Sequence, residues 1–155
     1  MSHPTLAAVR LTRKAASVAI FNRTHLEYAR LRHLPTSTAK ARQALQAFLS
    51  WATAQFNVEM FAVEKADRID AARVQELTRA VEEHASRAAI PVWHAGKMQV
   101  IESYAEPAPK TRTELRTIAA GIWPMLATRD NNPLDLEAAA LGLYVQVERL
   151  LSTPQ

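Results

Sequence analysis

The sequence contains no cysteine and only three glycines among its 155 residues. Without thiols it can form no disulfide, no thiolate metal site and no cysteine nucleophile. The three glycines, Gly96, Gly121 and Gly142, all lie late in the chain. A phosphate-cradling loop needs glycines between an early strand and the helix that follows it. The sequence therefore gives no support to the nucleotide-binding proteins that use such a loop, including the actin-like ATPases.

Long apolar runs and the patterns of several enzyme classes are also missing. No run approaches the roughly 18 apolar residues that a membrane span requires, and Met1-Ser2-His3-Pro4 lacks the layout of a signal peptide. Ser17 and Ser50 have no GxSxG context, and the histidines have no HxxxH spacing. We therefore expect a cytoplasmic protein with no membrane partner, and neither a serine hydrolase nor a histidine-held metal site.

What the chain does have is the composition of an ordinary globular protein, with 48% apolar and 22% charged residues. Its length is enough for one domain with a substantial core, so we expect a single domain over residues 1–155.

The net charge of +4 is unevenly distributed along the chain. Residues 1–34 contain a single acid, Glu27, and the remaining chain is nearly neutral. Such a basic segment is typical of a surface that meets DNA or RNA, although arginines also protect the edge of a solvated sheet. The candidate nucleic-acid-binding residues are the six basic residues of this segment, Arg10, Arg13, Lys14, Arg23, Arg30 and Arg32.

Alternating patterns predict three strands in the first third of the chain, Ala7–Arg13, Ala15–Phe21 and His25–Leu34. The short connections predict an antiparallel meander, with Asn22 supplying the left-handed conformation of the second turn. A hydroxyl in residues 36–38 is expected to cap a helix that ends at Asn57.

The stretch Val58–Lys65 is the clearest candidate for a central strand, and it ends in the carboxylate of Glu64. A helix lies before it, so a right-handed parallel crossover to the same sheet is expected. A second helix follows through Ala88, with Asp70 as its candidate cap, and Ile90–Trp93 suits a final strand.

The last third is expected to be helical. Residues 95–109 form the least regular connection, a helix is expected over Lys110–Ile122, and Asn131-Asn132-Pro133 is a typical helix start. Ala138–Ala140 and Gly142 would allow the final helix to approach a sheet closely. The spacing predicts an apolar face on that helix made of Leu136, Ala139, Ala140, Leu143, Val147 and Leu150.

The order β-β-β-α-β-α-β followed by helices resembles the ribonuclease H-like fold, and within it the RuvC-like resolvases. The resemblance covers nearly the whole chain. It implies an α/β fold with a mixed five-stranded sheet, the first strand central beside the fourth, and helices on both faces. It also implies two-metal phosphodiester hydrolysis by magnesium or manganese ions held on carboxylates.

In the resolvases those carboxylates come from the first strand, the end of the fourth strand and the last helix. Glu64 matches the glutamate of the fourth strand, and Asp135 or Glu137 matches the helical acids. The first strand has no acid, and the position of the expected aspartate falls near Thr12. A neutral hydroxyl replaces an anionic ligand of magnesium poorly.

Three functional hypotheses follow. The first is a catalytically degenerate resolvase-like domain that needs no cofactor and binds nucleic acid or a protein partner. The second is an active metal-dependent nuclease that uses Glu64, Asp135 and Glu137 with magnesium or manganese. The third is a homo-oligomeric structural protein. If the three carboxylates converge on one point, the second hypothesis is favoured.

Overall fold

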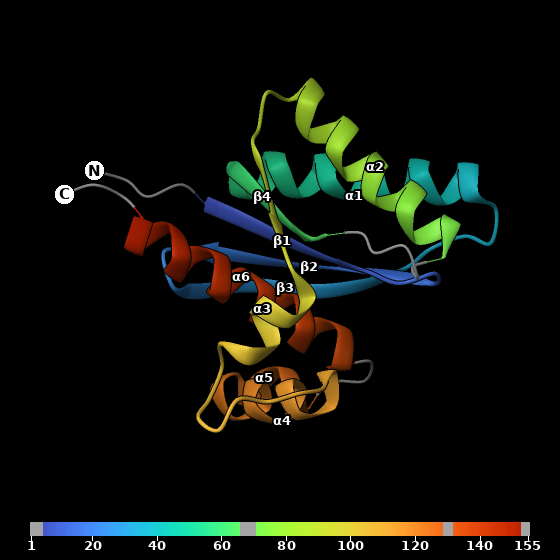
Figure 1. Ribbon diagram of the computed structural model, residues 1–155. Coiled ribbons are helices and arrows are strands. Elements are labelled where there is room, and N and C mark those ends of the chain that lie inside the picture. The colour runs from blue at the N-terminus through green and yellow to red at the C-terminus, as the bar shows by residue number, and fades with distance from the viewer. Residues whose placement is uncertain (1–4, 66–70, 129–131, 153–155) are drawn as a thin grey trace.

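The computed structural model describes residues 5–65, 71–128 and 132–152. A five-stranded sheet is the centre of the structure (Figure 1). Its strands lie in the order β3-β2-β1-β4-β5, so the first strand is central and pairs with the fourth, as predicted. The strands are β1 (Thr5–Leu11), β2 (Ala15–Asn22), β3 (His25–His33), β4 (Val58–Glu64) and β5 (Val92–Ala95).

The three N-terminal strands form the predicted antiparallel meander. The turn between β2 and β3 differs from the prediction in one respect, because Arg23 and not Asn22 has the positive φ of 56°. Asn22 remains in the ladder opposite His25, which leaves Arg23 and Thr24 as the two loop residues. The left-handed conformation therefore falls one residue later than the composition suggested.

Strands β1, β4 and β5 run parallel to one another. Val9 lies opposite Val63, so the carboxyl ends of β1 and β4 meet at the same end of the sheet. Ile90 and Pro91 precede β5, which therefore begins two residues later than predicted. The mixed sheet agrees with the predicted ribonuclease H-like architecture.

One face of the sheet is covered by α1 (Thr38–Phe56) and α2 (Ala72–Arg87) (Figure 1). Ser37 caps α1 by accepting a hydrogen bond from the Lys40 amide, and Asn57 ends it with a φ of 55°. Both features match the predicted helix start and stop. The predicted cap of α2, Asp70, lies outside the described residues. Side chains such as Leu45, Leu49 and Leu77 fill the space above the sheet and are fully buried.

The other face is covered by α6 (Asn132–Ser152). As predicted, small residues allow a close approach: a Cβ atom at Gly142 would lie 2.5 Å from the Phe21 ring. The predicted apolar face is wrong near the end of α6. Val147 and Leu150 are exposed, because the last turns of the helix carry them away from the core, whereas Leu141 is fully buried.

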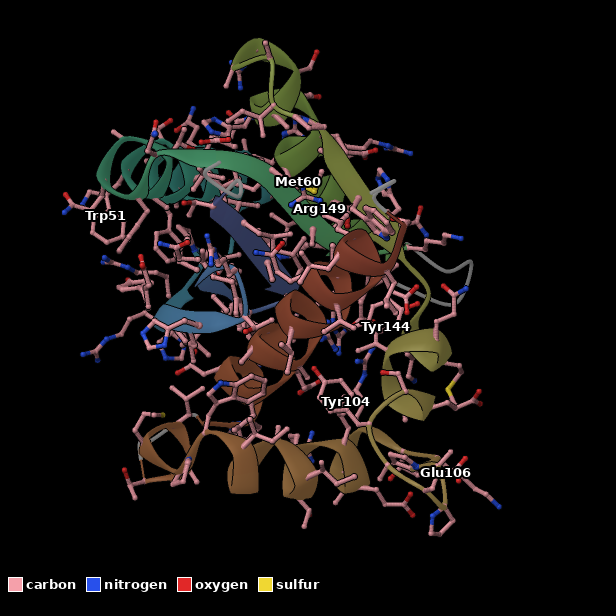
Figure 2. The ribbon with its side chains drawn as sticks, turned by 90° about the vertical axis from the view of Figure 1, so that its left-hand side faces the viewer. Trp51, Met60, Tyr104, Glu106, Tyr144 and Arg149 are labelled. Carbon is pink, nitrogen blue, oxygen red and sulfur yellow. The ribbon has the colours of Figure 1, made fainter. Side chains whose placement is uncertain are left out.

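Three shorter helices pack beside α6: α3 (Lys97–Glu102), α4 (Arg112–Ile122) and α5 (Pro124–Ala127). Tyr104, which follows α3, donates a hydrogen bond to the Ala140 carbonyl and fixes the connection to α6 (Figure 2). Burial raises the pKa of its phenol and keeps it protonated. In the described part of the chain, no helix combines the length and apolarity required to cross a bilayer.

Candidate functional site

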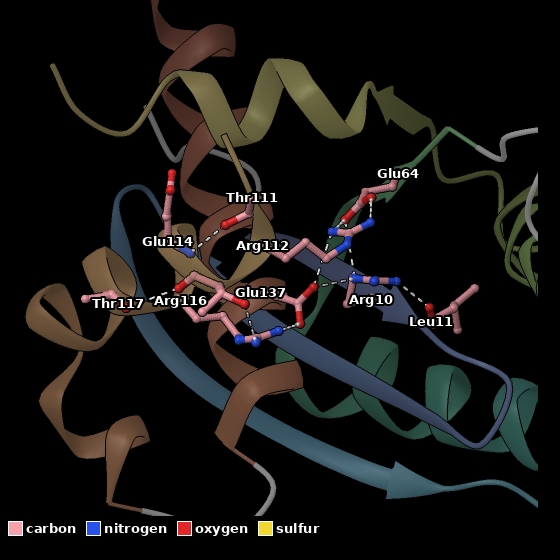
Figure 3. A network of polar contacts seen from close by, with 10 residues as sticks. Arg10, Leu11, Glu64, Thr111, Arg112, Glu114, Arg116, Thr117 and Glu137 are labelled. Carbon is pink, nitrogen blue, oxygen red and sulfur yellow. Dashed lines mark hydrogen bonds and ion pairs between the residues drawn. The ribbon is translucent and has the colours of Figure 1, made fainter. Parts of the chain in front are cut away.

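Two oppositely charged side chains meet where β1 and β4 end. The parallel register pairs Val9 with Val63, so the next residues, Arg10 and Glu64, are neighbours on the face that α6 covers. Arg10 Nε lies 3.4 Å from Glu64 Oε2 and 3.2 Å from an oxygen of Glu137, which comes from α6 (Figure 3). Arg10 therefore links two of the predicted carboxylates across the end of the sheet.

Two further arginines reach the same carboxylates from α4. Thr111 caps this helix by accepting a hydrogen bond from the Glu114 amide, which sets Arg112 in the first turn and Arg116 one turn later. Arg112 donates to both oxygens of Glu64 at 2.9 and 2.8 Å, the fork geometry that suits a carboxylate.

Both α4 arginines also approach Glu137 (Figure 3). Arg112 Nη1 lies 3.2 Å from Glu137 Oε1, and Arg116 Nη1 lies 3.5 Å from Glu137 Oε2. We call Arg10, Glu64, Arg112, Arg116 and Glu137 the arginine–glutamate cluster. Its three guanidinium groups outnumber its two carboxylates.

The cluster is partly buried: the side chains of Arg10 and Glu64 are each 15% exposed, and that of Arg116 is 31% exposed. Burial alone would raise the pKa of Glu64. The hydrogen bonds from Arg112 and the positive charges of Arg10, Arg112 and Lys97 outweigh it, so the pKa of Glu64 is lowered. The arginines hold Glu64 ionised inside the protein.

Asp135, the third predicted carboxylate, lies beside the cluster, bound to the residue that pairs with Arg10 across the sheet. It is buried and accepts a hydrogen bond of 2.6 Å from Ser17 on β2. Asp135 and Glu137 are two residues apart on a helix and therefore project in different directions. The structure thus brings Glu64 and Glu137 onto the same arginine and places Asp135 on Ser17, the strand neighbour of that arginine.

Thr12 lies outside the first strand, which ends two residues earlier than predicted. β1 ends at Leu11, and Thr12 belongs to the turn, where its hydroxyl oxygen accepts a hydrogen bond of 3.2 Å from the Ala15 amide. The residue of β1 that faces Glu64 and Glu137 is Arg10. Where β1 meets the two glutamates, the chain therefore presents a positive charge.

The residues present do not fit a pair of divalent cations. Among the described residues, no group of three or more histidines, cysteines, aspartates or glutamates is placed to hold a metal ion. The two carboxylates that do meet are each bound by two or more arginines. A metal ion would have to displace these guanidinium groups and add its charge to a cluster that is already positive.

Beside the cluster lies a pocket of about 460 Å³ between the ends of β1 and β4 and the start of α2. Arg10, Arg13, Lys65 and Arg112 line it, and Glu64 is its one acidic lining residue among those described. Arg13 and Lys65 are exposed. This end of the sheet therefore combines a concave surface with an excess of positive charge.

The remaining predicted basic residues are spread over the sheet. Lys14 follows Arg13 in the turn between β1 and β2, at the end of the sheet where the cluster lies. Its carbonyl accepts a hydrogen bond from the Leu34 amide, just after β3. Arg30 and Arg32 lie on β3, opposite Val18 and Ala16. Arg23 is at the other end of the sheet, so the structure does not bring all six residues together.

The sequence analysis missed Arg112, Arg116 and Lys65 as members of this region. Lys65 directly follows Glu64, and its place beside the pocket could have been inferred from the strand end. The α4 arginines gave only a weak signal, their spacing of four residues. Their role depends on how α4 docks against α6, which no local pattern records.

No protein-family model matches the sequence, and no curated protein is similar to it in sequence. Solved structures, however, match almost the whole chain. RuvC from Thermus thermophilus superposes with a TM-score of 0.77 over 96% of this chain and 97% of its own, at 18% identity. The chain has the ribonuclease H-like fold. The yeast mitochondrial Holliday junction resolvase gives a TM-score of 0.62 at 8% identity, covering 93% of this chain and 82% of its own.

The fowlpox virus Holliday junction resolvase is a third similar structure. Its TM-score is 0.60 at 11% identity, with 96% of this chain and 99% of that one covered. The predicted RuvC-like form of the fold is therefore confirmed. At these identities the similarity establishes the fold, and the chemistry has to be argued from the residues of this chain.

Proposed function

We propose that this protein is a non-cleaving, RuvC-like domain that binds the phosphate backbone of DNA at the end of the sheet where β1 and β4 stop. The observation that carries the proposal is the arginine–glutamate cluster. Arg10 presents a positive charge where β1 meets the two glutamates, and it neutralises these carboxylates. The site is thereby suited to anions and unsuited to divalent cations.

Two features support DNA as the anion. RuvC of Thermus thermophilus and the fowlpox virus resolvase, which share this fold, have each been solved in complex with Holliday junction DNA. The exposed side chains of Arg13 and Lys65 border the pocket next to the cluster. Arginine and lysine are the usual partners of DNA phosphates, and their contacts require no particular base sequence.

The test is a binding and cleavage assay on four-way junction, duplex and single-stranded DNA with magnesium or manganese present. We expect binding that weakens steeply with salt and no cleavage. Replacing both Arg13 and Lys65 by alanine should weaken binding at least tenfold. It should also reduce the slope of log K against log salt by about one for each phosphate that the protein no longer neutralises.

The control for each single variant, Arg13→Ala or Lys65→Ala, is Arg23→Ala, which removes one positive charge at the opposite end of the sheet and should leave binding within about twofold. Cleavage that disappears in Glu64→Gln would overturn the proposal and favour the nuclease hypothesis. If no salt-dependent binding is found, light scattering tests the remaining hypothesis, in which the protein assembles with copies of itself.

A further inference from the structure

A second surface, distinct from the arginine–glutamate cluster, combines aromatic rings with arginine. Although aromatic residues make up only 6% of the chain, four of them gather where α1 passes the edge strand β3. We call this set the aromatic–arginine surface; its members are Tyr28, Arg32, Phe48, Trp51 and Phe56.

The register of the sheet explains why these residues meet. Tyr28 and Arg32 lie opposite Ile20 and Ala16, whose side chains belong to the core under α1. Alternate residues of β3, including Tyr28, Arg30 and Arg32, therefore lie on the face of the sheet that α1 covers. Because β3 is the edge strand, its side chains stand beside α1, where Phe48, Trp51 and Phe56 flank them.

The rings are close to one another but not fully enclosed. The ring centres of Tyr28 and Trp51 are 5.5 Å apart, and those of Phe48 and Trp51 are 6.1 Å apart with nearly parallel planes at 25°. Trp51 is 41% exposed and projects from α1 at the periphery of the molecule (Figure 2). Its indole offers a flat, accessible surface.

The charged group that lies over these rings is a guanidinium. The guanidinium carbon of Arg32 lies 5.0 Å from the ring centre of Phe48 and 6.0 Å from that of Trp51. No ion pair links Arg32 or Arg30 to any carboxylate in the described part of the chain. Helix α1 itself contains no acidic residue.

We propose that the aromatic–arginine surface binds single-stranded nucleic acid, with unpaired bases stacked on Trp51 and phosphates held by Arg30 and Arg32. The positive charges favour a polyanion over an apolar protein segment, and accessible rings can stack on any base. A duplex hides the faces of its bases, so a single strand is the better fit. The inference extends the proposed function to a second surface and does not depend on the cluster.

The test uses oligothymidylate as the probe and the fluorescence of Trp51 as the signal. Saturable quenching is expected in the wild type and should be lost in Trp51→Phe, which keeps an aromatic ring and should bind within about threefold of the wild type. Trp51→Ala, checked for folding by thermal unfolding, should weaken binding roughly tenfold. Arg32→Gln should also weaken binding and lower its salt dependence.

Trp93→Phe is the matched control, because Trp93 packs against the core under α6 and its replacement should change neither quenching nor affinity. The Arg13→Ala/Lys65→Ala protein should still show the quenching, which separates this proposal from that for the first site. Unchanged affinity in Trp51→Ala would overturn the inference. Self-association of the wild type that Trp51→Ala abolishes would overturn it too, by assigning the surface to a second copy of the chain.

Discussion

The two faces of the sheet are each covered by apolar side chains, but the helices approach them differently. On the α1 and α2 side, large residues such as Leu45 and Phe61 fill the space between helix and sheet. On the α6 side, Gly142 and neighbouring alanines bring a helix backbone close to β2, and the arginine–glutamate cluster lies on the same side. The α1 and α2 face is stabilised by the packing of these large buried side chains. The α6 face depends on the position of one helix, because that position decides whether Glu137 meets Arg10.

The largest effect is expected from removing volume on the α1 side. Phe61 is fully buried, so Phe61→Ala leaves a cavity and should lower the free energy of unfolding by about 3–5 kcal/mol. Denaturant unfolding measures this decrease. A decrease below about 1 kcal/mol would show that this face is not held by packed volume.

The charged side of the comparison is tested by Arg10→Met. Without the guanidinium, the negative charges of Glu64 and Glu137 lose one of the positive charges that balance them. The free energy of unfolding is therefore expected to fall by about 1–3 kcal/mol. Combining Arg10→Met with Glu137→Gln should recover part of this stability. Additive effects in this double-mutant cycle would show that the two side chains do not interact in solution.

The close approach of α6 is tested by Gly142→Ala. The added methyl would overlap the ring of Phe21, so we expect a net loss of about 1–2 kcal/mol despite the better helix propensity of alanine. Phe21→Leu should reduce the penalty. The control is Gly121→Ala in α4, where no atom lies within 4 Å and a gain of up to about 1 kcal/mol is expected.

The smallest effect is a difference in how the two faces respond to acid. Burial, with the charge of Arg87 adding to it, lowers the pKa of His84 on α2 below 6.5, so its contribution to stability is present above pH 6.5 and lost as the pH falls through the lowered value. Arginine contacts lower the pKa of Glu64 below 4.5, so its contribution is lost only in more acidic solution.

Melting temperatures of the wild type, His84→Gln and Glu64→Gln across this pH range separate the two contributions. His84→Gln should flatten the profile below pH 6.5, and Glu64→Gln should flatten it below pH 4.5. Identical profiles for all three proteins would show that neither group is perturbed by folding.

Local patterns were enough to predict most of the fold. Asn57 ends α1 in the left-handed conformation, Ser37 caps its start, and the antiparallel meander and the parallel crossover follow from the chain order of the elements. These features depend on a few adjacent residues or on general rules of connection, whereas the central place of β1 was implied by the resemblance. Val147 and Leu150 show the limit of such patterns. Their helical spacing predicts that they lie on the buried face, but it does not show where along the helix that face leaves the core.

The site was predicted less completely. Glu64 and Glu137 were identified and do meet, but Arg10 was read as part of a DNA-binding surface. A signal existed: Arg10 lies on the same face of β1 as the buried Leu6 and Ala8, and a charge on such a face requires a partner. The contributions of Arg112 and Arg116 depend on tertiary docking and left no comparable pattern.

The tight junction between α1 and β4 has a consequence for the two proposed binding surfaces. Asn57 is the single residue between the helix that carries Trp51 and the strand that ends at Glu64, and its left-handed conformation leaves no flexible linker. The two surfaces therefore keep a constant separation. A nucleic acid long enough to touch both would bind the second at a high effective concentration once the first is occupied, so two weak contacts would add up to tight, length-dependent binding.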